Sequence, residues 1–276
     1  MTVVPLPGVD AAQLLGALQQ EATHIANLRS TVGAGVDRFN AYLRWSNDAF
    51  SRLRLMLPGR ELDRLITTPR YWTLQAMDPS SRLQTLAGFV DLEITERLRE
   101  FESESDRLSA EIARWNSRPG RLVIADTNVF LHSEEYFDEL PWAQVVGGSM
   151  GVHLIIPMLI IDELDRAKRT QGGKKVSDSN HESVRTRARV TLRRIDQTLR
   201  PGRAAMLQQG AVSAEVLLDE PGRARLSDAD DELVDQAVAL HQLIGRDVYI
   251  VTSDVGMKYR AEGAGLHAVL RSEQIL

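Results

Sequence analysis

The sequence predicts an α/β fold in its second half, a parallel sheet sandwiched by helices, preceded by an all-α N-terminal domain. Two changes of pattern support this. Up to about residue 117, apolar residues recur at spacings of three, four or seven, which is typical of amphipathic helices. After Gly120, short aliphatic runs alternate with helical segments, as in a parallel sheet flanked by helices. We therefore divide the chain into a helical domain, residues 1–118, and an α/β domain, residues 119–276.

The helical domain begins with two amphipathic stripes, Leu14 to Leu28 and Phe39 to Leu53, the second closed by Pro58-Gly59. Asp78-Pro79 then supplies an N-cap and a first-turn proline for a long helix. Its apolar seam consists of Leu83, Leu86, Val90, Ile94, Leu98, Phe101, Leu108, Ile112 and Trp115. Such a seam can pack within the domain or against a second chain. A homodimer through the N-terminal helices and a substrate-positioning role are therefore both open.

The α/β domain contains five runs that predict strands. They are residues 122–125, 153–156, 215–218, 248–251 and 267–270. Arg118-Pro119-Gly120 ends the long helix before the first of them. The alternation of these runs with helical segments predicts crossover connections and hence parallel strands.

The composition excludes several classes of function. The 276 residues include no cysteine, which excludes disulfides, thiolate metal sites and cysteine nucleophiles. The six histidines are scattered without HExxH spacing, so zinc is not expected. No apolar run approaches the roughly 20 residues of a membrane span, and the first residues lack the basic start of a signal peptide. We expect a cytoplasmic protein without a membrane partner.

Four acidic residues stand where a predicted strand ends or a helix begins. Asp126 and Asp254 directly follow strands, whereas Glu163 and Asp231 lie early in helices. Each alone could be a helix cap or a solvated side chain. Together, at the carboxyl edge where open α/β sheets bind ligands, they would repel one another unless a cation neutralised them. Oxygen-only ligands favour Mg²⁺ or Mn²⁺.

These motifs resemble the PIN domain nucleases in their order along the chain. The matching stretches are Ile124-Ala125-Asp126-Thr127-Asn128, Ile161-Asp162-Glu163-Leu164, Asp230-Asp231-Glu232-Leu233-Val234 and Thr252-Ser253-Asp254. The resemblance covers about residues 121–276 and leaves the helical domain unassigned. It implies a divalent metal ion and hydrolysis of phosphodiester bonds, usually in RNA.

Carried over residue by residue, the resemblance makes Asp126, Glu163, Asp231 and Asp254 the catalytic and metal-binding acids. Asn128, Asp228, Asp230 and Ser253 would orient these acids or the substrate. Asp228 and Asp230 compete with Asp231 for the third place, and Asp231 is preferred because Leu233 and Val234 follow it in the apolar phase of the family.

A basic segment follows Glu163. Residues 166–203 hold twelve basic and three acidic side chains, an excess of nine positive charges in a chain whose formal net charge is −5. A solvated helix face is the usual reason for such a run, but the excess is too large for a lattice of salt bridges and favours phosphate contact. The candidate nucleic-acid-binding residues are Arg169, Lys174, Lys175, Arg185, Arg189 and Arg193.

The sequence thus predicts a metal-dependent endoribonuclease acting on single-stranded or structured RNA. One alternative is a non-catalytic nucleic-acid-binding protein with the same fold, although such a protein needs no repelling carboxylates beside phosphate. Another is a small-molecule phosphatase with an aspartyl nucleophile, for which Asn128 stands where a second aspartate is wanted. Small members of the family act as toxins with a paired antitoxin, and the helical half departs from that form.

Overall fold

The computed structural model describes residues 3, 5–31, 33, 35–77, 83–148, 151–169, 183–207, 211–219 and 223–271. By internal contacts the chain divides into two compact units, which are residues 1–116 with 242–245, called here the helical unit, and residues 117–241 with 246–276, called the α/β unit. Among the described residues, no helix combines the length and the apolar character that crossing a bilayer requires.

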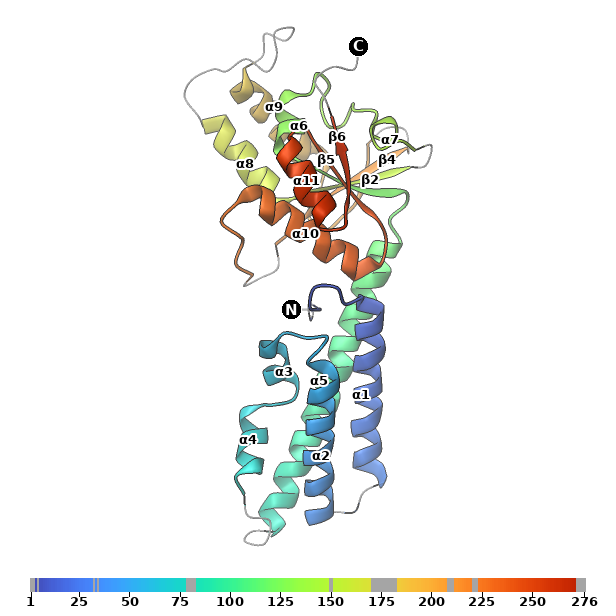
Figure 1. Ribbon diagram of the computed structural model, residues 1–276, viewed down its shortest axis with the longest axis vertical. Coiled ribbons are helices and arrows are strands. Elements are labelled where there is room, and N and C mark those ends of the chain that lie inside the picture. Colours follow the sequence, from blue (N-terminus) through green and yellow to red (C-terminus); the bar gives the residue numbers. More distant parts are fainter. Residues whose placement is uncertain are drawn as a thin grey trace. The chain divides into compact units, whose positions relative to one another are not determined.

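The helical unit contains the first five helices of the chain (Figure 1). They are α1 (Ala11–Thr31), α2 (Val36–Leu53), α3 (Gly59–Leu65), α4 (Pro69–Gln75) and α5 (Leu83–Asn116). Thr68 caps α4 by accepting a hydrogen bond from the Tyr71 amide, and Pro69 occupies the first turn, where its missing N–H is not needed. The Asp78-Pro79 cap predicted for α5 lies outside the described residues.

The predicted apolar seam of α5 is buried inside the helical unit. Helices α1 and α2 pack along α5, and the residues of the seam that belong to or pack against this core are Leu86, Val90, Ile94, Leu98, Phe101, Leu108 and Ile112. Leu86, Val90, Ile94, Phe101 and Leu108 are covered by their own unit, whereas Leu98 and Ile112 are only partly buried. A homodimer through the N-terminal helices stays a prediction.

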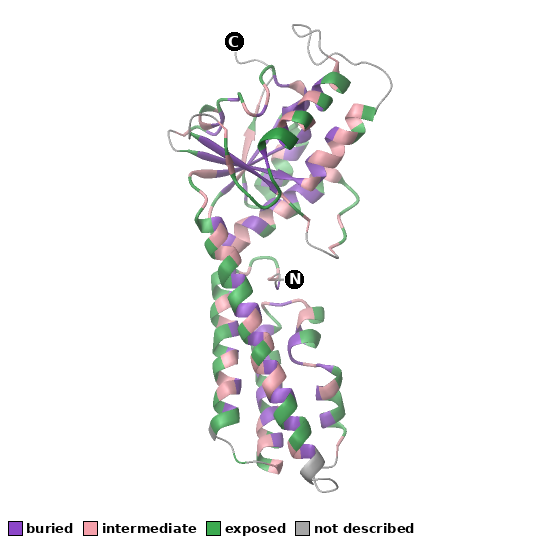
Figure 2. Cartoon of the chain, turned by 180° about the vertical axis from the view of Figure 1, so that it is seen from behind, coloured by how far each residue is buried: buried purple, intermediate pink, exposed green. Residues whose placement is uncertain are grey.

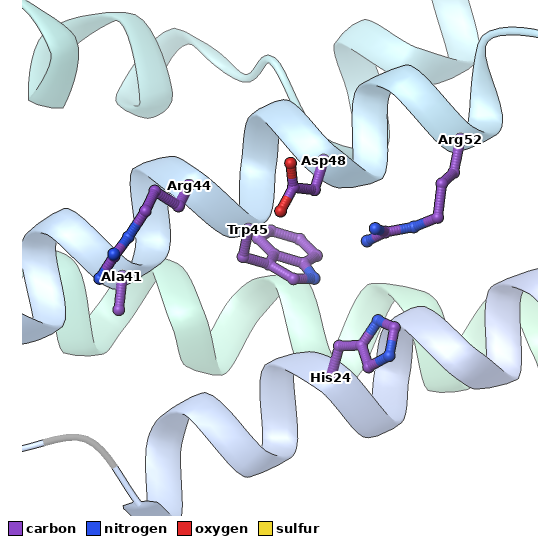
Figure 3. A pocket seen from close by; sticks show the side chains of 6 residues that line it. All are labelled: His24, Ala41, Arg44, Trp45, Asp48 and Arg52. Atoms are coloured by element: carbon purple, nitrogen blue, oxygen red, sulfur yellow. The ribbon is translucent and has the colours of Figure 1, made fainter.

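Among the described residues of the helical unit, the buried carboxylates are Glu21, Glu93 and Glu104. Glu21 accepts hydrogen bonds from Trp45 Nε1 at 3.1 Å and from Arg52 Nε at 2.6 Å. Figure 3 shows a pocket lined by two of these donors, Trp45 and Arg52 of α2, with His24 of α1 opposite them. Buried charges are tolerated when they are paired in this way.

The α/β unit is built on a six-stranded sheet in the order β3-β4-β2-β1-β5-β6. The strands are β1 (Arg121–Ala125), β2 (Val152–Pro157), β3 (Ala205–Met206), β4 (Val212–Leu217), β5 (Val248–Thr252) and β6 (His267–Leu270). The helices are α6 (Thr127–His132), α7 (Trp142–Val145), α8 (Met158–Arg169), α9 (Val184–Thr198), α10 (Ala229–Ile244) and α11 (Val255–Gly263). All pairings are parallel except that of β3 with β4.

The predicted fold class is therefore confirmed. All six residues of β2 are buried, as expected for a central parallel strand covered on both faces, and the sheet is largely purple in Figure 2. Helix α8 packs on β2, and α11 packs on β5 and β6.

Two details of the sheet differ from the sequence prediction. The short antiparallel edge strand β3 was not expected, and β4 begins three residues before the predicted run at 215. The first part of β4 contains polar residues, so an apolar pattern does not reveal it as a strand. Ser213 bonds the buried His153 ring at 2.8 Å, and the buried Glu215 accepts from Arg118 Nη2 at 2.6 Å. Apolar patterning misses a strand whose buried polar groups are satisfied in pairs.

The direction in which strands are added reverses between β1 and β5, so the carboxyl ends of these two strands form a topological switch point. From β1 the chain builds β2, β3 and β4 on one side and then returns through α10 to place β5 on the other side. The carboxyl edge at such a reversal is where open α/β sheets bind ligands. Because Ala125 lies beside Val251 in the parallel register, the residues that follow β1 and β5 are neighbours.

Candidate active site at the carboxyl edge of the sheet

Asp126 is the innermost acid of this edge. It follows the last residue of β1, is 7% exposed, and caps α6 by accepting a hydrogen bond from the Asn128 amide at 3.2 Å. Its other carboxylate oxygen accepts from Thr252 Oγ1 at 2.9 Å. The aspartate is thus held between the ends of two adjacent strands.

Asp254 comes to the same place from β5. Its amide donates to Thr252 Oγ1 at 2.9 Å, so one buried hydroxyl joins the two aspartates. Asp254 Oδ1 caps α11 by accepting from the amides of Gly256 at 2.5 Å and Met257 at 3.1 Å. The Thr252-Ser253-Asp254 stretch is therefore a strand end that turns directly into a capped helix.

Glu163 extends this group from α8. The hydroxyl of Thr127 donates a hydrogen bond to Glu163 Oε2. Since Thr127 directly follows Asp126, this bond places the glutamate next to the end of β1. Glu163 lies on the same face of α8 as the buried Leu159 and Ile160, four and three positions before it, so the helix turns the glutamate toward the interior of the unit.

Of the acids at the start of α10, Asp230 is the one that shares its surroundings with Asp126 and Asp254. Partial burial raises the pKa of the Asp230 carboxyl above its ordinary value. The carboxylates of Asp126, Asp228 and Asp254 add to this rise, since like charges disfavour ionisation, and Arg260 offsets part of it. Carboxylates from three separate segments of the chain therefore interact electrostatically at this edge.

Asp231, the residue preferred from the sequence, lies differently from Asp230. Its side chain is 55% exposed and pairs with Arg260 Nε at 3.3 Å. Asp228 Oδ1 accepts from the amides of both residues and so fixes the first turn of α10. Consecutive helical residues point about 100° apart, so the two side chains leave α10 in different directions, although Arg260 contacts both carboxylates. The preference for Asp231 from the apolar phase of Leu233 and Val234 stays a prediction.

The remaining predicted residues are distributed around these acids. Asn128 donates from its side chain to Asp126 at 3.4 Å, in keeping with an orienting role. Asp228 caps α10, and Ser253 is exposed directly after β5. No role was predicted for Thr127, Thr252 or Arg260, although both threonines stand within the quoted motifs. The threonines were missed because a small hydroxyl residue does not stand out in the pattern of apolar and polar positions.

The donors at this edge are carboxylate oxygens, which suit hard divalent cations such as Mg²⁺ or Mn²⁺. Burial is the main cause of the raised pKa of Asp230, and repulsion by the neighbouring carboxylates, which a cation would relieve, adds to it. Within the described ranges, no three acidic or histidine side chains are set to hold a metal ion directly. Each acid is turned instead toward a protein donor: Thr252, Thr127, Arg260 or the first amides of α11.

The basic segment is only partly free for substrate. Arg187 is buried on α9 and donates to the backbone carbonyls of Phe130 and Glu134, while Arg194 pairs with Asp138 and Glu139. Arg169 pairs with Asp165. Arg185, Arg189 and Arg193 are exposed along one stripe of α9, at successive spacings of four. Lys174 and Lys175 lie outside the described residues.

The chain is an α/β protein with a mostly parallel sheet, and its carboxylates gather at the switch point of that sheet. The family model of the PIN domain matches residues 123–270, slightly more than half of the chain, so the chain belongs to the PIN domain family. The fold is thereby nuclease-like, in a family whose members are typically nucleases and generally use divalent metal ions. Comparison with curated proteins and with solved structures gave no match for the chain.

Proposed function

We propose that the chain is a metal-dependent endoribonuclease whose acidic site consists of Asp126, Glu163, Asp230 and Asp254. The observation that carries the proposal is the shared field of Asp126, Asp230 and Asp254 at the sheet edge. A protein that only bound RNA would gain nothing from carboxylates that repel phosphate. Asp231 keeps a subsidiary place, because its side chain is 55% exposed, against 40% for Asp230.

The chemistry follows from where the acids lie. Mg²⁺ or Mn²⁺, when bound by these carboxylates, supplies a polarised phosphoryl oxygen and a water of lowered pKa. Thr252 and Asn128 hold the carboxylate of Asp126, and Thr127 holds that of Glu163, so the acids keep their directions. Hydrogen bonds that orient ligating groups commonly contribute 10- to 100-fold to affinity or activity.

The proposal is tested by incubating the purified full chain with labelled single-stranded and hairpin RNA. We expect cleavage within the RNA in Mg²⁺ or Mn²⁺ and none with a chelator. Absence of cleavage with any divalent ion, together with firm RNA binding, would instead favour the non-catalytic binding protein. Turnover of a small phosphomonoester would favour the phosphatase.

The exposed stripe of α9 is proposed as the RNA-binding surface. Its three arginines follow α8, which carries Glu163. Phosphate contacts release counterions, and each contributes about 0.7 to the slope of log affinity against log salt for single strands. Changing Arg185, Arg189 and Arg193 together to glutamine should therefore weaken RNA binding and lower that slope by about 2.

Titrations of RNA binding at several salt concentrations measure this effect. A matched control removes Arg29, Arg54 and Arg99, three exposed arginines of the helical unit, with the same change in net charge. Equal losses from both triple variants would show that the α9 stripe has no special part in binding.

A further inference from the structure

Arg260 of α11 lies against the acidic site in a way that the proposed chemistry does not use. Its Nη1 donates to Asp230 Oδ2 at 2.7 Å, and its Nε lies 3.3 Å from Asp231 Oδ1. One guanidinium therefore spans two consecutive acids at the start of α10. This is the kind of forked contact that arginine makes with carboxylates.

The same guanidinium also lies close to Asp254. A Cβ atom added to Gly256 would lie 3.0 Å from Asp254 Oδ1 and 3.9 Å from Arg260 Nη1. The first turn of α11 therefore brings this cation and the strand-end aspartate around a single glycine. Arg260 is thus a positive charge in the field that links Asp126, Asp230 and Asp254.

We propose that Arg260 is a built-in counter-cation of Asp230, which a divalent metal ion must displace before that carboxylate can become a ligand. This inference rests on the proposed function, because it concerns the same acids. A carboxylate oxygen directed at a guanidinium is not directed at a metal, and the two cations compete for the same charge. Arg260 thereby sets the metal concentration at which the site fills.

The pair is well placed for such an exchange because it is accessible. The side chains of Arg260 and Asp230 are 45% and 40% exposed, so the contact can open without leaving a buried charge unpaired. Exposed ion pairs are weak. Removing this one should tighten metal binding by about two- to fivefold, without removing any ligand.

The test compares Mn²⁺ affinity, measured by calorimetry on the full chain, between the unaltered protein and Arg260→Gln. Lys258→Gln is the matched control, because Lys258 lies on the same helix and pairs with Glu262 at 3.6 Å instead. We expect the Arg260 variant to bind Mn²⁺ about two- to fivefold more tightly, and the Lys258 variant to change less. Arg260→Lys should stay close to the unaltered protein. Thermal melting should show a larger Mn²⁺-induced rise for Arg260→Gln.

Equal or weaker Mn²⁺ binding by Arg260→Gln, relative to Lys258→Gln, would overturn the role of Arg260 and leave the nuclease proposal standing. If neither the unaltered protein nor Arg260→Gln binds millimolar Mn²⁺, both proposals fail together. Binding that appears only in Arg260→Gln would support the displacement in its strongest form.

Discussion

Replacing Asp126 with asparagine is expected to lower the rate of RNA cleavage by at least about a hundredfold while leaving the fold intact. Changing residues that only orient metal ligands commonly costs 10- to 100-fold in metal affinity or activity, so loss of a proposed ligand should exceed that range. Asparagine caps helices as well as aspartate does, so α6 keeps its first hydrogen bond from the Asn128 amide. The Thr252 hydroxyl can turn to accept from the new amide.

The control for this variant is Asp235→Asn, which removes a 54% exposed acid of α10 that pairs with Arg223. It should cleave RNA at the rate of the unaltered protein. Initial rates on labelled RNA in Mn²⁺, with circular dichroism to check folding, measure both variants. A folded Asp126→Asn protein that still cleaves at near the normal rate would refute the proposed site.

The same assay separates the two candidates for the third acid. Because Asp230 shares the field of Asp126 and Asp254, Asp230→Asn should be severely impaired. Asp231→Asn should lose little activity, because the Asp231 side chain is 55% exposed, against 40% for Asp230. The reverse order would restore the residue preferred from the sequence.

The comparison of these two residues shows how far the sequence can define the site. Asp126 and Asp254 could be placed from the sequence because a buried aliphatic strand ends at a definite residue, and parallel strands end at one edge. The start of α10 holds Asp228, Asp230 and Asp231 within four positions. Choosing among them needs the rotation of the helix about its axis, which depends on its packing against other elements.

Arg260 shows a second limit of what the sequence can predict. Nothing in its local sequence separates it from the other surface arginines of a chain rich in them. Its importance comes from α10 and α11 meeting at the sheet edge, 30 positions apart in sequence from Asp230. The contacts of the buried Glu215 with Arg118 and His153 also join residues far apart in the sequence, and they were missed together with the true start of β4.

Replacing Glu93 with alanine is expected to destabilise the helical unit by about 3–5 kcal/mol, the cost of breaking a buried ion pair. Glu93 is 1% exposed on α5. It accepts from Thr68 at 2.8 Å and from Tyr42 at 3.3 Å, and it lies 3.1 Å from Nε of the buried Arg97. Without Glu93, Arg97 would be a buried cation without its carboxylate partner.

Glu96→Ala provides the matched control on the same helix. Glu96 is 40% exposed and pairs with Arg70 at 2.7 Å, so its loss should cost no more than about 1 kcal/mol. Urea unfolding followed by tryptophan fluorescence is the suitable measurement, since Trp45, Trp72 and Trp115 all lie in the helical unit.

The size of the Glu93 effect depends on how many elements its carboxylate joins. Thr68 caps α4, Tyr42 belongs to α2, and Glu93 itself lies on α5. Tyr42 is fully buried, and its burial and the neighbouring Glu93 carboxylate raise the pKa of its hydroxyl. Glu93→Gln keeps the volume and part of the hydrogen bonding but removes the charge that balances Arg97. The loss of stability in Glu93→Gln should therefore lie between the losses in Glu96→Ala and Glu93→Ala. Equal stabilities for all three variants would mean that the junction contributes no more than an exposed ion pair.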